Sequence, residues 1–422
     1  MAVIRDTVER HLVSVPGPKV SQHARLLFLD TLGCALAGRR APEVRALESQ
    51  LAGLDAGQFS FPGSERLGVR AAAQILAIAP TWDEACEGHA YAHGRPGIPV
   101  LAALIPLALR RKETLGAFTA ALVMGYEVGA RAGGWLRVAK GLHVDGNWPG
   151  IGVAAAVARM LNADPLSAAN TAACQLPNSL YLPVRSGLTV RNTYLGHSAT
   201  LGLDAALAAQ AGFGAPADAL AHYAEHFCAA DERPLPTAGE DLILDAYFKP
   251  FAAVRHVHYG ALAARTLRSA PGTIKDIELT VYEEALTYCG NRDPQTPLAA
   301  QFSLSFGVAS MLRFGELEPA CYDEPRFSDA ELRRLEKLVR LRPDPELTAN
   351  RRRGARLTVV AGETRTAETS DAHPHLVLDD AGVVAKFTRN AASMPPERSR
   401  AFCDAVLLAP ADVPFETLWG ML

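Results

Sequence analysis

The chain has 422 residues, enough for two or three domains or for one large domain with an insertion. It is 49% apolar and 21% charged, which is typical of a globular protein. Its formal net charge is −3 and it has no long basic stretch, which argues against nucleic acid and anionic membrane surfaces as partners.

Neither a membrane span nor a signal peptide is expected. No run of about 18 uncharged apolar residues occurs, and the first residues mix acids and bases with apolar side chains. The seven cysteines are scattered singly, which favours reduced thiols and a cytoplasmic location. It also argues against a cysteine-ligated iron–sulfur cluster, which needs clustered thiolates.

The first 265 residues have the three- and four-residue spacing of apolar side chains that is typical of helices. A helix over 21–37, capped by Ser21 and ended by Gly38, is apolar almost all round, which predicts that it is buried. We interpret Asp30 in its middle as a structural acid with a hydrogen-bond partner. Further helices are expected at 66–79, 99–112, 115–132, 151–162, 165–175, 197–212 and 257–268.

The pattern changes near residue 270. Apolar residues alternate over 277–281 as in a strand, and 355–370 predicts two strands joined at Ala361-Gly362. Helices are expected at 299–314, at 328–341 with Ser328 as its cap, and at 395–409. We therefore predict a mainly α fold. A large all-helical domain over 1–268, completed by a C-terminal helix within 391–422, carries a smaller α+β domain over 269–390.

Polar and titratable residues concentrate in the Gly- and Pro-rich connections that lead into four of these helices. If the helix N-termini converge, they form a cationic pocket suited to a polycarboxylate. An imidazole there would remove a proton next to a carboxylate. The residues are Asp83, Glu84, Glu87, His89, His93 and Arg95; Lys140, His143, Asp145 and Asn147; Arg185, Arg191 and His197; and Lys249, Arg255, His256 and His258.

Each of these residues also has a structural interpretation, because a lone loop histidine is more often solvated and a lone Lys or Arg is more often a surface charge. His222, Glu225 and His226 match the H-x-x-E-H order of some zinc peptidases, but no third ligand stands out, so a zinc site is disfavoured. The chain has no nucleophile elbow, P-loop or dinucleotide fingerprint.

An ordered set of segments over almost the whole chain resembles the MmgE/PrpD family, which includes 2-methylcitrate dehydratase, cis-aconitate decarboxylase and an iminodisuccinate epimerase. The resemblance implies a helical domain with a smaller α+β lid domain and an active site between them. It also implies a homodimer and no metal or organic cofactor. The segments are RLLFLDTLGCALAG, PVLAALIPLAL, GYEVGAR, GLHVDG with GIGVAAAVARML, KPFAAVRHVHYGALAA and NRDPQTPLAAQFSLSFGVAS.

The resemblance also implies site residues, position by position. The acid- and histidine-rich loop of the family falls on 83–95, with its first Asp at Asp83 and its last His at His93. A family lysine is replaced by Arg191, which would clamp a carboxylate instead of moving a proton. A histidine specific to the decarboxylase is Val254 here, which argues against decarboxylation. The remaining matched positions are His143, Lys249, His258 and Tyr288.

The leading hypothesis is a dehydratase-type lyase, without a cofactor, that acts on a small di- or tricarboxylic acid. An isomerase or epimerase on a similar substrate is the first alternative, and a catalytically inactive binding protein of the family is the second. A zinc hydrolase is the most distant. The expected catalytic residues are Asp83, His93, His143, Lys249 and Tyr288, and the expected substrate-binding residues are Arg191 and His258.

Overall fold

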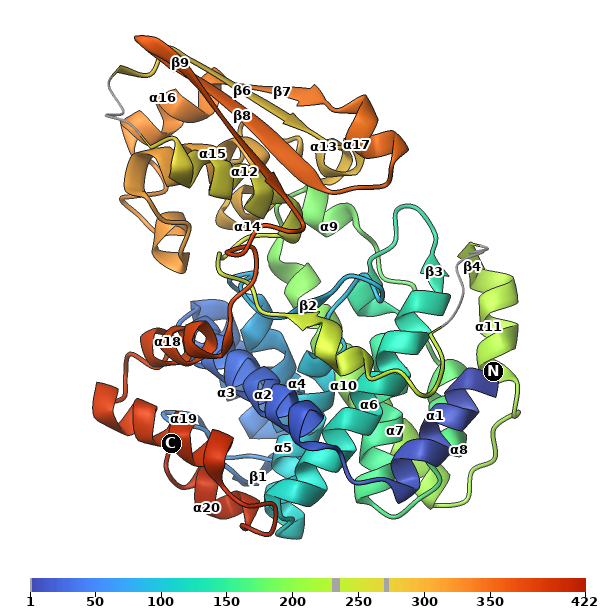
Figure 1. The fold of residues 1–422 in the computed structure, drawn as a ribbon. Coiled ribbons are helices and arrows are strands. Elements are labelled where there is room, and N and C mark those ends of the chain that lie inside the picture. Colours follow the sequence, from blue (N-terminus) through green and yellow to red (C-terminus); the bar gives the residue numbers. More distant parts are fainter. Residues whose placement is uncertain (1, 230–235, 269–272) are drawn as a thin grey trace.

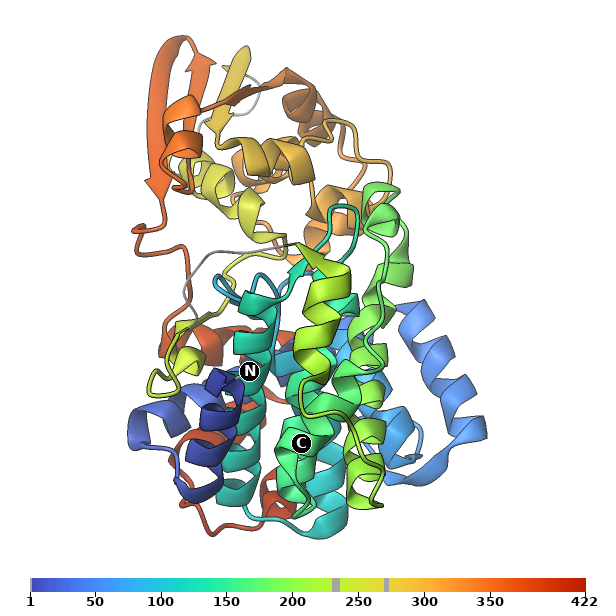
Figure 2. The same cartoon turned by 90° about the vertical axis from the view of Figure 1, so that its right-hand side faces the viewer.

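A computed structural model describes residues 2–229, 236–268 and 273–422 and shows a mainly α fold with a smaller α+β part at one end (Figure 1). This confirms the predicted fold class. We call the helices within Ala2–Phe227 and Asp380–Trp419 (α1–α11 and α18–α20) the larger unit. The helices and strands within Arg255–Ser370 (α12–α17 and β6–β9) are the smaller unit. The two units lie one above the other in both Figure 1 and Figure 2.

The larger unit is a bundle of helices with α7 in its middle, against α5, α6, α8 and α10. Every residue of α7 except Arg159 is buried, as expected for a helix that is apolar all round. The helices are α1 (Ala2–Val13), α2 (Pro18–Gly38), α3 (Pro42–Leu54), α4 (Val69–Ile78), α5 (Gly97–Arg111), α6 (Leu115–Trp135), α7 (Pro149–Met160), α8 (Pro165–Ala173), α9 (Leu182–Arg185), α10 (Tyr194–Gln210), α11 (Ala219–Phe227), α18 (Asp380–Asn390), α19 (Pro396–Leu408) and α20 (Phe415–Trp419).

Small residues allow α6 and α7 to approach closely. A Cβ atom on Gly152 would lie 2.4 Å from the backbone oxygen of Gly125, closer than atoms can pack. The many glycines and alanines of the sequence therefore have a direct packing role in this bundle.

Helix α2 begins at Pro18, with Gly17 as its N-cap, and not at the predicted Ser21, because proline suits the first turn of a helix. Asp30 in its middle is buried and accepts a hydrogen bond from Lys386 Nζ of α18 at 2.7 Å. Its structural interpretation is thereby supported by a named partner.

The smaller unit is a four-stranded sheet in the order β7-β6-β8-β9, with β6 parallel to β7 and antiparallel to β8. Helix α12 packs against α15 and against β8 and β9. Alternate residues of β6 are buried, as the sequence predicted. The elements are α12 (Arg255–Thr266), α13 (Glu283–Cys289), α14 (Pro297–Gln301), α15 (Leu304–Phe314), α16 (Ala330–Leu338), α17 (Pro345–Ala349), β6 (Asp276–Val281), β7 (Val339–Pro343), β8 (Gly354–Ala361) and β9 (Glu363–Ser370).

Two predicted helices of this unit differ from the structure. The helix expected over 299–314 is divided into α14 and α15, because Ser303 caps a new helix by accepting from Phe306 N. The helix expected over 328–341 begins after Asp329, which caps it, and ends at Leu338. The residues that follow form β7, which pairs with β6, so pairing with the sheet ends this helix.

Short strands also lie within the mostly helical first part of the chain: β1 (Ala56–Phe59), β2 (Gly88–His89), β3 (Arg137–Val138), β4 (Cys228–Ala229) and β5 (Ala246–Tyr247). Strand β2 pairs antiparallel with β5. This pairing joins the loop over 83–96 to the segment that leads to Lys249.

The domain limits at 268 and 390 stay a prediction, and the predicted start of the smaller domain at residue 269 lies outside the described residues. Because α12 packs on the sheet and α18 packs on α2, we propose that the smaller unit begins at α12 and ends before α18. Among the described helices, none combines the length and the apolar character needed to cross a membrane.

Candidate active site

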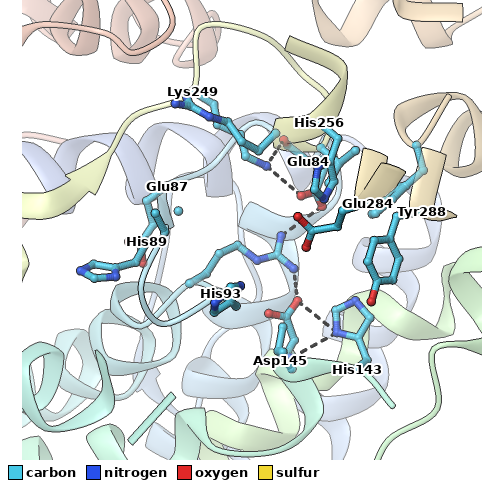
Figure 3. Close-up of a pocket in the computed structure, with 18 of the residues that line it drawn as sticks. Glu84, Glu87, His89, His93, His143, Asp145, Lys249, His256, Glu284 and Tyr288 are labelled. Atoms are coloured by element: carbon cyan, nitrogen blue, oxygen red, sulfur yellow. Dashed lines mark hydrogen bonds and ion pairs between the residues drawn. The ribbon is translucent and has the colours of Figure 1, made fainter. Parts of the chain in front are cut away.

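A cavity of about 230 Å³ lies between the two units and is lined by residues from both (Figure 3). Its lining is unusually rich in ionisable side chains. Five are cationic, four are carboxylic and four are histidines: Arg95, Arg191, Lys249, Arg255 and Arg353; Glu84, Glu87, Asp145 and Glu284; His89, His93, His143 and His256. Perturbed ionisable groups gathered in a cleft are typical of a functional site.

Five of the seven residues predicted from the sequence line this cavity: His93, His143, Arg191, Lys249 and Tyr288. Asp83 does not, because its carboxylate turns away and pairs with Arg40 at 2.6 and 2.8 Å. His258 does not either, because it is buried beside Phe251 with its Nε2 bonded to the backbone oxygen of Ala253 at 2.9 Å. Direct roles for Asp83 and His258 therefore have no support in the geometry.

Glu84 occupies the place that was predicted for Asp83. Lys249 Nζ donates to both its Oε1 and its backbone oxygen at 2.8 Å, and Arg95 Nη1 donates to its Oε2 at 3.1 Å. Arg191 Nη2 pairs with the same Oε2. Burial by itself would raise the pKa of Glu84, but the charges of Arg95, Lys249 and Arg191 outweigh it and hold the pKa well below its usual range.

Asp145 is the second buried carboxylate, and Arg95 bridges it to Glu84 (Figure 3). Asp145 lies in the 3-10 turn η2 (Val144–Gly146), which ends shortly before α7, and the hydroxyl of Ser198 donates to its backbone oxygen at 2.9 Å. The ion pair with Arg95 therefore ties the start of α7 to the loop over 83–96.

His143 stands beside this pair, with its ring stacked on Tyr181 at 5.6 Å between centroids. Burial lowers the pKa of His143 to about 4, so its imidazole is uncharged at neutral pH. Its Nδ1 accepts a hydrogen bond from the backbone N–H of Asp145 at 3.2 Å. In the neutral ring the proton is then on Nε2, and His143 offers the cavity a hydrogen-bond donor.

The loop over 83–96 holds Glu84 at φ 51° and His93 at φ 55°, both in the left-handed region that side chains rarely adopt. Such conformations cost about 1–3 kcal/mol each and persist only where neighbouring contacts impose them. The hydrogen bond from His89 N to Gly94 O, 2.9 Å long, closes the turn that contains His93, and ion pairs with Lys249, Arg95 and Arg191 hold Glu84. Both strained residues line the cavity, as is common at functional sites.

Glu87 closes the cavity near the first turn of α5. Its Oε1 accepts from the backbone N–H groups of Gly97 and Ile98 at 2.5 and 3.1 Å, and Tyr126 donates to its Oε2 at 3.2 Å. Burial raises the pKa of Glu87 to about 8, so this carboxyl is protonated at neutral pH.

The smaller unit supplies the opposite wall. Tyr288 stacks on His256 at 6.0 Å and meets the ring of Tyr181 edge-on at 5.3 Å, and Figure 3 shows its hydroxyl end pointing towards His143. His256 Nδ1 bonds to the hydroxyl of Tyr282 at 2.5 Å, and burial lowers the pKa of His256 to about 3. Arg353 pairs with Glu284 at 3.2 Å.

Sequence reasoning found the loops but not every residue in them. Glu84, Arg95, Asp145 and His256 lie in three of the four connections that were singled out, next to or near residues that were chosen instead. Arg353 is the last of three consecutive arginines in a stretch with no motif, so nothing in the sequence distinguished it.

His222, Glu225 and His226 form a group on α11 whose possible ligand atoms lie within 4.8 Å of one another. All three side chains are exposed and none of them lines the cavity. A metal held there would not reach a substrate bound between the two units.

Comparison with known families adds an independent observation. Residues 4–229 match the family model described as the MmgE/PrpD N-terminal domain, and residues 251–407 match the MmgE/PrpD C-terminal domain. No curated protein matches the chain by sequence.

Proposed function

Because the chain belongs to the MmgE/PrpD family, we propose that it is a dehydratase-type lyase acting on a small di- or tricarboxylic acid. One observation carries this proposal. His93, His143, Tyr288 from the other unit, and the cations Arg191 and Lys249 all line a single cavity. This set offers proton transfer beside positive charge, which removal of a proton next to a carboxylate requires.

The hydrogen bonding of the site favours a division of roles between the histidines. His143 has its Nδ1 occupied by the Asp145 N–H and presents Nε2–H, so it suits a donor to departing or developing oxygen. His93 is then assigned as the base that removes the proton next to the substrate carboxylate. Arg191 lines the cavity, and its Nε is buried without a hydrogen-bond partner among the described residues, which favours Arg191 as a partner of a substrate carboxylate.

The proposed reaction is an elimination. His93 takes a proton from the carbon next to a carboxylate, and Arg191 and Lys249 stabilise the enolate-like charge that develops. The electron pair of the broken C–H bond forms a carbon–carbon double bond as the bond to a neighbouring hydroxyl breaks. The hydroxyl leaves as water with a proton donated by the Tyr288 hydroxyl, while the Nε2–H of His143 hydrogen-bonds to the departing oxygen.

An isomerase or epimerase is the second candidate, because His93 and His143 line the same cavity and one can remove a proton that the other returns. Such a reaction needs no leaving group. The mass of the product distinguishes the two reactions. Elimination lowers the mass by 18 units, the mass of water, whereas epimerisation leaves the mass unchanged.

The test is incubation of the protein with a panel of small di- and tricarboxylic acids in deuterated water. We expect one or more acids to exchange a C–H for deuterium, and we expect His93→Ala to lower the exchange rate by about 10²–10⁴, the usual contribution of general acid–base catalysis. NMR and mass spectrometry measure the exchange and any loss of water.

His222→Ala is the matched control, because it removes an exposed histidine that does not line the cavity. The proposal fails if no acid in the panel exchanges, or if His93→Ala and His222→Ala exchange at the same rate as the wild type.

A further inference from the structure

The cations of the cavity form two groups, one in each unit. We call Arg95, Arg191 and Lys249, with Glu84 and Asp145, the floor cluster, and Arg255, Arg353 and Glu284 the wall cluster. In the floor cluster, two buried carboxylates face three buried cations through direct ion pairs. The protein therefore neutralises two of these three positive charges itself.

The wall cluster has the same excess. Arg353 pairs with Glu284 at 3.2 Å. Arg255 is held by a hydrogen bond to the backbone oxygen of Leu376 at 2.8 Å. Its carboxylate partner Asp371 is 3.8 Å away, mostly exposed and not part of the lining. An ion pair of that kind is weak. The start of α12, at Arg255, adds the partial positive charge of a helix N-terminus.

The other titratable lining groups leave this balance unchanged. Glu87 is protonated at neutral pH because burial raises its pKa to about 8. Burial lowers the pKa of His89, and those of His143 and His256 to about 4 and about 3, so these rings are uncharged. His93 is exposed, so solvent weakens the effect of any charge on its ring, and His93 is not counted in this balance.

We propose that this cavity takes a dicarboxylate, with one carboxylate on the floor cluster and the other on the wall cluster. The inference rests on the proposed function and narrows its substrate class. Enclosing an uncompensated charge is unfavourable, because the charge loses its hydration without gaining a counter-charge. A tricarboxylate would bring one negative charge without a counter-charge, and a monocarboxylate would leave one cluster unmatched.

Binding calorimetry at pH 7.5 with three probes of different charge tests this: butyrate, succinate and tricarballylate. We expect succinate to bind at least tenfold more tightly than either of the others. Arg353→Gln should weaken succinate at least tenfold, while Arg352→Gln, the same change at the neighbouring exposed arginine, should leave succinate binding unchanged.

Glu84→Gln changes the balance on the floor cluster by one charge, and it should shift the preference from succinate towards tricarballylate. A circular dichroism spectrum checks that the variant folds, and the Arg353 and Arg352 pair decides the question if it does not. Tighter binding of tricarballylate to the wild type, equal succinate affinity in the two arginine variants, or no binding of any probe would overturn the inference.

The C–H exchange assay separates this inference from the proposed function. If succinate is preferred in an Arg353-dependent way but no acid exchanges a C–H, the dicarboxylate site is supported and the lyase proposal is rejected. If a tricarboxylate binds more tightly than succinate and exchanges a C–H, the lyase proposal is supported and the dicarboxylate inference is rejected.

Discussion

At the scale of single residues, one backbone angle decides which acid enters the cavity. Asp83 and Glu84 are neighbours, and either could have been the site acid from sequence alone. Glu84 has a left-handed φ of 51°. Its carboxylate pairs with Arg95, Arg191 and Lys249. The carboxylate of Asp83 instead pairs with Arg40. A buried carboxylate among three cations is held in place, because moving it would leave unpaired charges.

His143 and His93 should respond differently to substitution if the division of roles is correct. His143→Ala removes a donor to the leaving oxygen, so water loss should fall at least tenfold more than C–H exchange does. His93→Ala removes the base, so both rates should fall by the same factor. Parallel measurement of deuterium uptake and product mass checks this, and an equal fall of both rates in His143→Ala would contradict it.

At the scale of elements, contacts with helices α5 and α18 hold the loops of the site in place. Helix α5 begins at Gly97, and its first free N–H groups are bound by the Glu87 carboxyl. Helix α18 inserts Lys386, whose Nζ binds Asp30 of α2 at 2.7 Å and the backbone oxygen of Lys249 at 3.2 Å. It also binds the backbone oxygen of Ala85. Helix α18 thereby fixes the backbone on both sides of the floor cluster.

Replacing Glu87 by Gln should change how stability depends on pH. The pKa of Glu87 is about 8 in the folded protein against 4.5 for an ordinary glutamate. Its stabilising contribution is therefore complete below pH 4.5 and is lost as the pH rises to about 8. Glutamine has the same shape and never ionises. The free energy of unfolding of Glu87→Gln relative to wild type should therefore increase between pH 5 and pH 8.5, by up to about 1.4 kcal/mol per pH unit. Melting temperatures of both proteins across this pH range measure the change.

Glu397→Gln is the matched control, because Glu397 is an exposed glutamate in the first turn of α19. A difference between Glu87→Gln and wild type that stays constant with pH would show that Glu87 is ionised throughout this range.

At the scale of the whole molecule, the cavity exists only where the two units face each other. Glu284 and Tyr288 come from α13, whereas Glu84 and His93 come from the loop over 83–96 of the larger unit (Figure 3). A ligand that contacts both clusters must therefore connect two units that pack separately.

Hydrogen–deuterium exchange of backbone amides should report that connection. Succinate should slow exchange in α13 and in the loop over 83–96 together, because one dianion restrains both walls. Butyrate at the same occupancy should slow exchange in only one of them. Exchange in α11, which lies outside the cavity lining, serves as the internal reference. Protection by succinate confined to one unit would contradict a bridging ligand.

The sequence by itself determined the mainly helical class, the change to α+β near residue 270 and the four connections whose residues line the cavity. These follow from apolar spacing and from the Gly- and Pro-rich composition of loops, which are local properties. The resemblance to the MmgE/PrpD family, confirmed by both family models, was also readable from ordered local segments.

Only the tertiary structure decided which side chains face one another. Glu84 and not Asp83 lines the cavity, and only the last of three consecutive arginines, Arg353, does so. Asp30 pairs with Lys386, which is 356 positions away in the sequence. Each depends on where a backbone turns and on which charge is already present in the cavity. Pairing of buried charges is settled by distances in space, and no local pattern of residues contains those distances.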